Sequence, residues 1–201
     1  MRIGILGSGS GTNAEAIMQS IEKGECPVEV AVVISDIETA GILDKARKHG
    51  VTARFINPGK YKTRLDEDAE KEYVRALKSS GVELIVLAGF MRLLSPSFVD
   101  RHRGRIVNIH PSLLPSFPGV DAIGQAWEYG VAVTGVTIHL VDEKMDHGPI
   151  LAQEALPVLP TEGRQGLEER MHQLEHRLYG DTLKRLFRCR LTFEGRRVLF
   201  D

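Results

Sequence analysis

Three residues of this chain carry side chains that together could move an acyl group. Asn108 and His110 stand two residues apart at the end of an apolar run, and Asp146 follows in a later turn. An amide N–H can stabilise the oxyanion that forms when a nucleophile attacks a carbonyl carbon. An imidazole can move protons, and a carboxylate can orient and charge that imidazole. The combination indicates acyl-transfer catalysis. The alternative is that His110 is a core histidine beside a turn-forming proline.

The run Ile106–His110 predicts the strand that positions the first two of these residues. Residues i and i+2 of a strand point to the same side, so Asn108 and His110 should face one site. The prolines that follow end the strand. The chain must turn sharply there, and cis peptide bonds are essentially confined to positions before proline, so we predict a cis Leu114–Pro115 bond.

Asp146 lies in the turn Glu143–Gly148, where an aspartate is often only a turn former. His139 on the preceding strand and His147 beside Asp146 are rival imidazoles for proton transfer. No cysteine is near these residues, which argues against a zinc site.

The glycine-rich segment Gly7–Asn13 lies between a predicted strand and a predicted helix. Its glycines allow the backbone to approach a ligand, and the helix N-terminus favours a phosphate. It lacks the Lys-Ser/Thr ending of a P-loop, which argues against a nucleoside triphosphatase. The dinucleotide fingerprint is incomplete because its last glycine position holds Thr12, although Asp36 leaves a nicotinamide cofactor open. A phosphate monoester fits better, and a simple tight turn is the alternative.

A second segment, Ala88–Leu94, follows the fourth predicted strand. Ligands of open α/β sheets bind beyond the carboxyl ends of the strands. This mostly apolar segment would suit a flat heteroaromatic ligand, and the alternative is an ordinary strand-to-helix junction.

The pattern of apolar runs predicts an α/β fold, with a doubly wound, mostly parallel sheet and an antiparallel strand pair in the C-terminal half. In the first half we expect strands Arg2–Leu6, Val28–Ser35, Thr52–Ile56 and Leu84–Ala88, with helices near Asn13–Lys23, Ile42–His49 and Leu65–Ser79. In the second half we expect helices Pro96–His102, Ala122–Tyr129 and Gly163–Cys189, strands Ile106–His110, Val133–Val141 and Ile150–Leu156, and a terminal hairpin in Leu191–Phe200. The short connection between the strands of the pair allows only an antiparallel arrangement.

The composition is that of an ordinary globular protein, with 42% apolar and 26% charged residues among 201. A formal net charge of -1 gives no sign of a nucleic-acid partner. Cys26 and Cys189 lie far apart and should be free thiols in a reducing compartment. The chain shows no signal peptide and no apolar run long enough for a membrane span. We expect a cytoplasmic protein of one domain, 1–201, with a nucleotide- or phosphate-binding half at 1–100 and a catalytic half at 101–201.

The sequence resembles the glycinamide ribonucleotide formyltransferases of purine biosynthesis over nearly its whole length. The segments that carry the resemblance, in order, are Gly9–Asn13, Leu87–Pro96, Asn108–Pro115 with Phe117–Gly119, Thr134-Gly135 and Val141-Asp142 through Asp146–Ile150. The joint match is highly specific, because the motifs follow one another at suitable spacing.

The resemblance implies a formyltransferase-like fold and a role for each matching residue. Asn108 would steady the formyl oxygen, His110 would donate a proton, and Asp146 would raise the pKa of the histidine. The nucleotide substrate, glycinamide ribonucleotide, would contact Gly11, Thr12, Asn13 and Glu175. The co-substrate 10-formyltetrahydrofolate would contact Arg64, Met91, Arg92, Leu93 and Leu94, together with Asn108. The 101–201 half would then carry folate-binding as well as catalytic residues. The resemblance also implies small-molecule substrates, without a metal, a nucleic acid or a membrane, and a protein that is a monomer or a homodimer.

Two positions depart from the usual pattern of these enzymes. Asp121 stands where many of them have a histidine, and Gly180 stands where a proline commonly follows the tyrosine. The first should change little, and the second concerns only a local bend of the helix.

Three other functions compete with this one. A 10-formyltetrahydrofolate hydrolase uses a similar Asn, His and Asp, but such enzymes resemble this domain preceded by a regulatory module, and here the first strand begins at Arg2. Methionyl-transfer-RNA formyltransferases carry Arg-Gly where this chain has Phe117–Gly119, and they need a further nucleic-acid-binding domain. A non-catalytic nucleotide-binding module would have no need of a proton donor.

Overall fold

The computed structural model describes residues 1–201 and divides into two compact units, Met1–Val107 and Asn108–Asp201. The boundary falls inside the strand that carries Asn108 and His110, so these two side chains belong to the second unit. The expected single domain over 1–201 stays a prediction.

The first unit alternates strands and helices along the chain. Its elements are β1 (Arg2–Leu6), α1 (Thr12–Glu22), β2 (Glu29–Ser35), α2 (Gly41–Lys48), β3 (Ala53–Phe55), α3 (Glu67–Ser79), β4 (Leu84–Leu87) and α4 (Pro96–Arg101). β1 pairs in parallel with β2 and with β4, and β2 pairs in parallel with β3. The predicted alternation is therefore confirmed.

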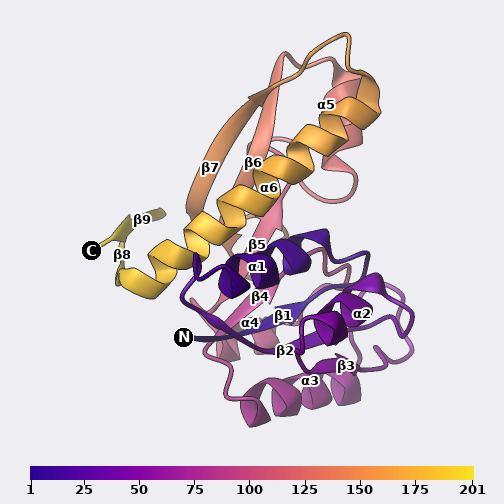
Figure 1. Cartoon of the computed structure of the whole chain (residues 1–201), viewed down its shortest axis with the longest axis vertical. Coiled ribbons are helices and arrows are strands. Elements are labelled where there is room, and N and C mark those ends of the chain that lie inside the picture. Colours follow the sequence, from indigo (N-terminus) through magenta and orange to yellow (C-terminus); the bar gives the residue numbers. More distant parts are fainter. The chain divides into compact units, whose positions relative to one another are not determined.

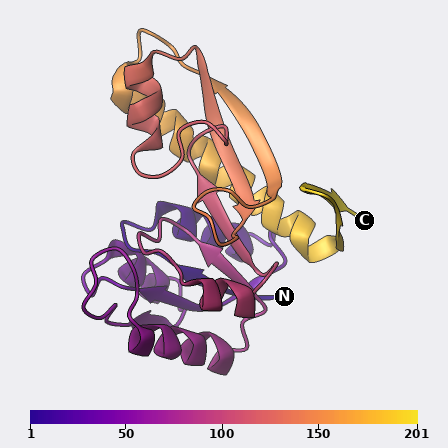
Figure 2. The ribbon, with the colours of Figure 1, turned by 180° about the vertical axis from the view of Figure 1, so that it is seen from behind.

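Most residues of β1 and β4 and the second half of β2 are buried because helices cover both faces of the sheet. α1 and α2 lie on one face, toward the viewer in Figure 1, and α3 and α4 lie on the other, toward the viewer in Figure 2. Val32, Val33 and Ile34 of β2 are fully buried. A strand covered on both faces has no polar side to alternate with, which explains its continuous apolar run.

The helix α3 packs closely against β1. A Cβ atom at Gly4 would lie 2.7 Å from the Leu77 side chain of α3. Asp66 caps this helix by accepting a hydrogen bond from Ala69 N, 2.9 Å away. The buried residues of α3 fall on one face at helical spacing, as an amphipathic helix requires.

The second unit contains the antiparallel pair predicted for the C-terminal half. Its elements are the end of β5 (Ile106–His110), then α5 (Ala122–Tyr129), β6 (Val133–Leu140), β7 (Ile150–Pro157), α6 (Gly163–Arg188), β8 (Leu191–Glu194) and β9 (Arg197–Phe200). β6 pairs with β7 in antiparallel register, interrupted by an irregularity between Ile138 and His139. The long helix α6 runs along β6 and β7 (Figure 1) and passes Gly180 without a break.

The strand order is β3-β2-β1-β4-β5-β6-β7, with a separate two-stranded sheet of β8 and β9. The predicted fold class, a mostly parallel α/β sheet with an antiparallel pair, is confirmed, although several element ends differ by one or two residues. The cis Leu114–Pro115 bond is also confirmed, and both cysteines are free.

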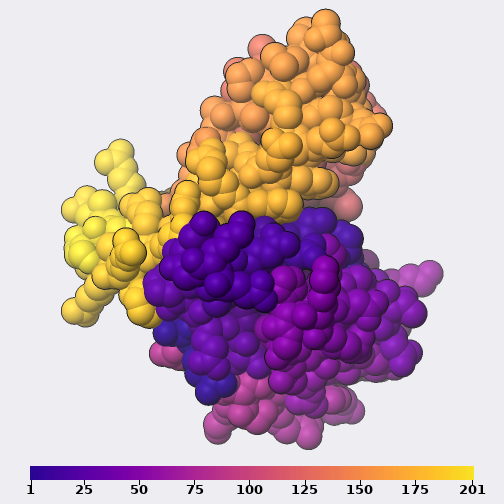
Figure 3. Space-filling model, in the orientation of Figure 1, coloured from indigo at the N-terminus to yellow at the C-terminus, as the bar shows by residue number.

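The terminal hairpin of β8 and β9 projects from the end of α6, and Figure 3 shows it in yellow. It pairs Leu191 with Phe200 and Glu194 with Arg197, as expected for a turn at Glu194–Gly195. No helix in the chain combines the length and the apolarity needed to cross a membrane.

Candidate active site

β5 presents Asn108 and His110 to one site, as its two-residue period predicts. His110 is 5% exposed and Asn108 is half-buried. Asp146 arrives from the connection between β6 and β7, and its Oδ2 lies 3.5 Å from His110 Nδ1. Its Oδ1 lies 3.5 Å from Asn108 Nδ2. The structure thus brings together the three residues that the sequence singled out for acyl transfer.

Asp146 is held in place by its backbone surroundings as well as by its charge. Its φ of 51° lies in the left-handed region, which few residues other than glycine adopt, although aspartate tolerates it better than most. Its Oδ2 accepts a hydrogen bond from Gly119 N, 2.8 Å away. The residue is therefore more than a turn former, because its carboxylate points into the cluster.

The neighbours of Asp146 keep it ionised. Burial by itself would raise the pKa of this carboxyl group. The His139 side chain in its protonated form, the Gly119 N–H and the positive charge that His110 can carry outweigh burial, and the net pKa of Asp146 lies below the usual aspartate value. A carboxylate is then present beside His110 at neutral pH.

The second ring nitrogen of His110 meets the loop that follows the cis bond. His110 Nε2 lies 2.8 Å from the backbone oxygen of Phe117, a residue with a φ of 50°. Nδ1 and Nε2 of His110 thus both face oxygen acceptors, an arrangement that suits an imidazole able to give up a proton.

The two rival imidazoles have different surroundings. His147 is exposed and pairs with Asp142 at 2.8 Å, outside the cluster. His139 is 2% exposed and lies inside it, with Nε2 3.2 Å from Asn108 Nδ2. The signal for His139 in the sequence is weak, a histidine near the end of a strand that also contains two threonines.

In the first unit, the glycine-rich loop ends at the N-terminus of α1. Gly11 is the N-cap residue with a φ of 78°, and a Cβ atom there would lie 2.6 Å from the backbone of Ile42. Only glycine fits this close approach. Thr12 and Asn13 open the helix, whose N-terminus offers N–H groups and the positive end of its dipole to an anion.

The predicted folate-binding segment lies beyond the carboxyl end of β4. Leu93 N donates a hydrogen bond to Thr63 O at 2.8 Å, and Arg64 forms a parallel bridge with Leu93. Met91 is 64% exposed and Leu93 is 53% exposed. Arg64 and the 91–94 segment therefore lie together, with large apolar side chains open to a ligand.

The side chain of Arg92 is held by hydrogen bonds to other residues of the first unit. Its Nε donates to Asp36 Oδ2 at 2.6 Å, and its guanidinium also donates to the backbone oxygens of Tyr61 and Lys62. Asp36 Oδ1 accepts a further hydrogen bond from Ser8 Oγ at 2.5 Å. The Asp36 carboxylate is thus occupied, which removes the argument for a ribose-binding acid and for a nicotinamide cofactor.

The remaining predicted site residue, Glu175, is 6% exposed on α6, in the second unit with the catalytic cluster. No group of three or more His, Cys, Asp or Glu side chains is arranged to hold a metal ion.

Comparison with known proteins identifies the family. Residues 1–183 match the formyl transferase family model. The phosphoribosylglycinamide formyltransferase of Bacillus subtilis is 37% identical over 92% of this chain and 94% of its own length. This chain belongs to the phosphoribosylglycinamide formyltransferase family. The human trifunctional purine biosynthetic protein adenosine-3 is 40% identical over 91% of this chain, which covers 18% of that longer protein.

Solved structures agree with this membership. A glycinamide ribonucleotide transformylase from Symbiobacterium toebii superposes with a TM-score of 0.93 and 44% identity, covering 100% of this chain and 93% of that one. A formyltetrahydrofolate deformylase from Pseudomonas syringae has a TM-score of 0.90 at 23% identity, covering 99% of this chain and 65% of that one. The second likeness shows a shared fold alone.

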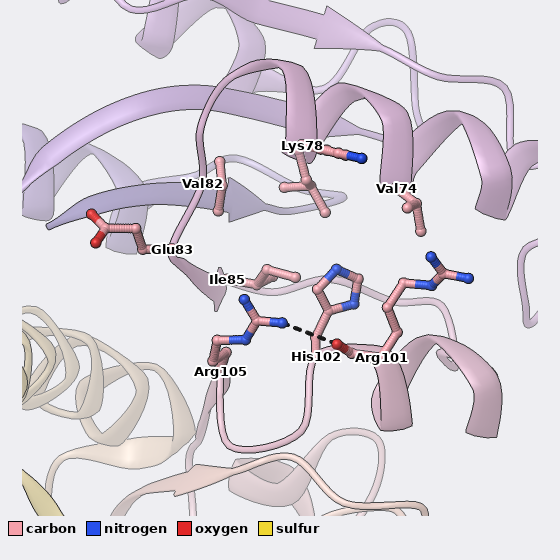
Figure 4. Close-up of a pocket in the computed structure, with 9 residues that line it drawn as sticks. Val74, Lys78, Val82, Glu83, Ile85, Arg101, His102 and Arg105 are labelled. Atoms are coloured by element: carbon pink, nitrogen blue, oxygen red, sulfur yellow. Dashed lines mark hydrogen bonds between the residues drawn. The ribbon is translucent and has the colours of Figure 1, made fainter.

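A surface hollow of about 240 Å³ lies elsewhere in this formyltransferase, between α3 and α4. Figure 4 shows His102 there between Arg101 and Arg105, with Arg105 donating to Arg101 O at 3.0 Å. The hollow adjoins the start of β4 and the residue before β5, the amino ends of these strands. Ligands of such sheets bind at the opposite, carboxyl ends, so the hollow is not the active site.

Asp121 stands at the position where the resemblance implies a histidine in many members of the family, and in this chain it has a structural function. It caps α5 by accepting a hydrogen bond from Gly124 N at 3.2 Å, and it pairs with Arg164 at 2.7 Å.

Proposed function

We propose that this protein transfers the formyl group of 10-formyltetrahydrofolate to the amino group of glycinamide ribonucleotide. The observation that carries the proposal is the buried cluster of Asn108, His110 and Asp146 in a member of this family. An amide, an imidazole and a carboxylate at these distances supply the groups that the reaction needs.

The proposed reaction begins when the amine nitrogen of glycinamide ribonucleotide attacks the formyl carbon. A new C–N bond forms, and the formyl oxygen becomes an oxyanion that Asn108 stabilises by donating an N–H. The bond from the formyl carbon to the folate nitrogen then breaks. His110 donates a proton to the departing folate nitrogen, and the neutral imidazole that is left then takes the proton that the product nitrogen loses. Asp146 stabilises the charged form of the imidazole.

The proposal also assigns residues to substrate binding. Gly11, Thr12 and Asn13 would bind the phosphate of the nucleotide, because a helix N-terminus after a close-packed glycine favours an anion. Glu175 would contact the same substrate.

Arg64, Met91, Leu93 and Leu94 would bind the folate, supported by the exposed apolar side chains beyond β4. Arg92 would contribute to folate binding through its backbone, since its side chain is held by Asp36. We also propose that the enzyme works in the cytoplasm, as a monomer or a homodimer.

The proposal is tested by incubating the protein with 10-formyltetrahydrofolate, with and without glycinamide ribonucleotide, and following the release of tetrahydrofolate. Release that requires the nucleotide is the expected result. Equal release without it would identify a 10-formyltetrahydrofolate hydrolase, and no release in either case would favour a non-catalytic nucleotide-binding module.

A further inference from the structure

His139 is a buried histidine whose ring nitrogens have different surroundings. Its Nδ1 lies 2.8 Å from the backbone oxygen of Leu140, an atom that can only accept. Nδ1 therefore carries the proton, and in the neutral ring Nε2 is left as an acceptor. The irregularity in the β6–β7 register falls directly before His139, and such bulges commonly redirect a side chain near an active site.

The acceptor nitrogen of His139 meets the carboxamide of Asn108. Nε2 lies 3.2 Å from Asn108 Nδ2, within hydrogen-bond distance, and 3.7 Å from Asp146 Oδ1, beyond it. Asn108 thus has two acceptors on one side, the imidazole nitrogen and the carboxylate. Only the NH₂ end of the amide satisfies both, so the amide oxygen must point the other way.

The two N–H groups of Asn108 differ in how firmly they are held. One donates to His139 at 3.2 Å, whereas the contact of Asn108 with Asp146 is long, at 3.5 Å. The weakly held N–H costs little to redirect toward a substrate oxygen. We propose that His139 is a positioning residue, which keeps the NH₂ end of Asn108 directed toward the developing oxyanion. The inference rests on the proposed formyl transfer.

Two substitutions separate this function from simple core packing. His139→Gln places an amide oxygen close to the position of Nε2 and can still accept from Asn108. His139→Asn reaches only the position of Nδ1, so it can donate to Leu140 O but leaves Asn108 unheld. We expect His139→Asn to lower kcat about 10- to 100-fold, less than the loss typical of removing an oxyanion donor itself, with KM unchanged. His139→Gln should retain most of the activity.

A double-mutant cycle tests whether the effect passes through Asn108. In an Asn108→Ala background, His139→Asn should change kcat by no more than about twofold. His147→Asn is the matched control, because this exposed histidine lies in the same region but outside the cluster, and its kcat should stay within about twofold of wild type. Circular dichroism and thermal melting confirm that each variant is folded.

The proposal is overturned if folded His139→Asn keeps the wild-type kcat, or if its loss is the same with and without Asn108. A folded His139→Gln as inactive as His139→Asn would also contradict it.

A measurement independent of activity completes the test. The side-chain amide signals of Asn108, assigned by their absence in Asn108→Ala, should shift in ¹⁵N-correlated spectra of His139→Asn and stay near their wild-type positions in His139→Gln. If formyl transfer to the nucleotide fails in the wild type, the proposed function is wrong, while these spectra still decide whether His139 holds Asn108. Unchanged Asn108 signals in His139→Asn would show that it does not.

Discussion

His110 is the residue of the cluster with the most direct part in the proposed chemistry, because its two nitrogens lie between the Asp146 carboxylate and the Phe117 carbonyl. His110→Ala should lower kcat about 10²- to 10⁴-fold, the usual range for a positioned acid–base group. Affinity for the nucleotide, measured by calorimetry, should hardly change. Near-normal turnover in this variant would move the proton-transfer assignment to His139.

Asn108 is expected to act in the transition state and little in substrate binding. Asn108→Ala should therefore reduce kcat by the equivalent of about 3–4 kcal/mol, with little change in KM. Asn108→Asp should be at least as damaging, since it sets one negative charge against another that is developing. Steady-state kinetics check both variants, and a change confined to KM would assign Asn108 a binding role instead.

The depressed pKa of Asp146 links this residue to acid stability. Since the folded pKa lies below the unfolded value, the carboxylate contributes stability above the unfolded pKa, near pH 4, and loses it as the pH falls through the folded value. Asp146→Asn should therefore show a smaller loss of stability than wild type between pH 5 and pH 2 in denaturant titrations.

The same substitution should lower formyl transfer at neutral pH, because the charge beside His110 is gone. Asp44→Asn, at an exposed side chain, provides the control for both measurements. An Asp146→Asn protein with normal activity and a wild-type acid profile would reduce this aspartate to a turn former.

Among the connecting elements, the loops at the carboxyl edge of the first unit are tied together by a buried ion pair. Arg92 and Asp36 have side chains that are 15% and 1% exposed, and they link the end of β2 to the segments 61–64 and 91–94. A fixed guanidinium at this point holds the proposed folate-binding segment in one conformation.

Breaking this pair should be costly because it leaves a buried charge without its partner. We expect Arg92→Met to lower the free energy of unfolding by about 3–5 kcal/mol. Adding Asp36→Asn should recover part of the loss, since the buried charge is then removed. Chemical denaturation of the three proteins checks this, and additive losses in the double variant would show that the two side chains are not coupled.

In the molecule as a whole, the predicted site residues lie in two compact units. The catalytic cluster and the groups that contact it lie in residues 108–201, contributed by β5, the 117–119 loop, β6 and the 142–149 connection. The loop before α1 and the segment after β4 lie in residues 1–107. The residues proposed for the chemistry thus lie in the second unit, whereas those proposed for ligand binding are divided between the first unit and Glu175 of the second.

The sequence by itself determined which segments form helices and strands and which of their side chains share a face. Continuous apolar runs in alternation with amphipathic helices predicted a parallel α/β sheet, because strands covered on both faces have no polar side. The two-residue period of β5 placed Asn108 and His110 on one face, since that relation depends only on local backbone geometry.

The tertiary structure alone decided which distant groups meet. The local pattern places His139 on a strand and His147 in a turn, but it does not show which of them meets Asn108. The register of β6 buries His139 beside Asn108, and His147 is exposed. Arg92 was predicted as a folate contact, but the fold turns its side chain toward Asp36. Such contacts join residues tens of positions apart, and they depend on how strands pair and loops close, which no short-range pattern encodes.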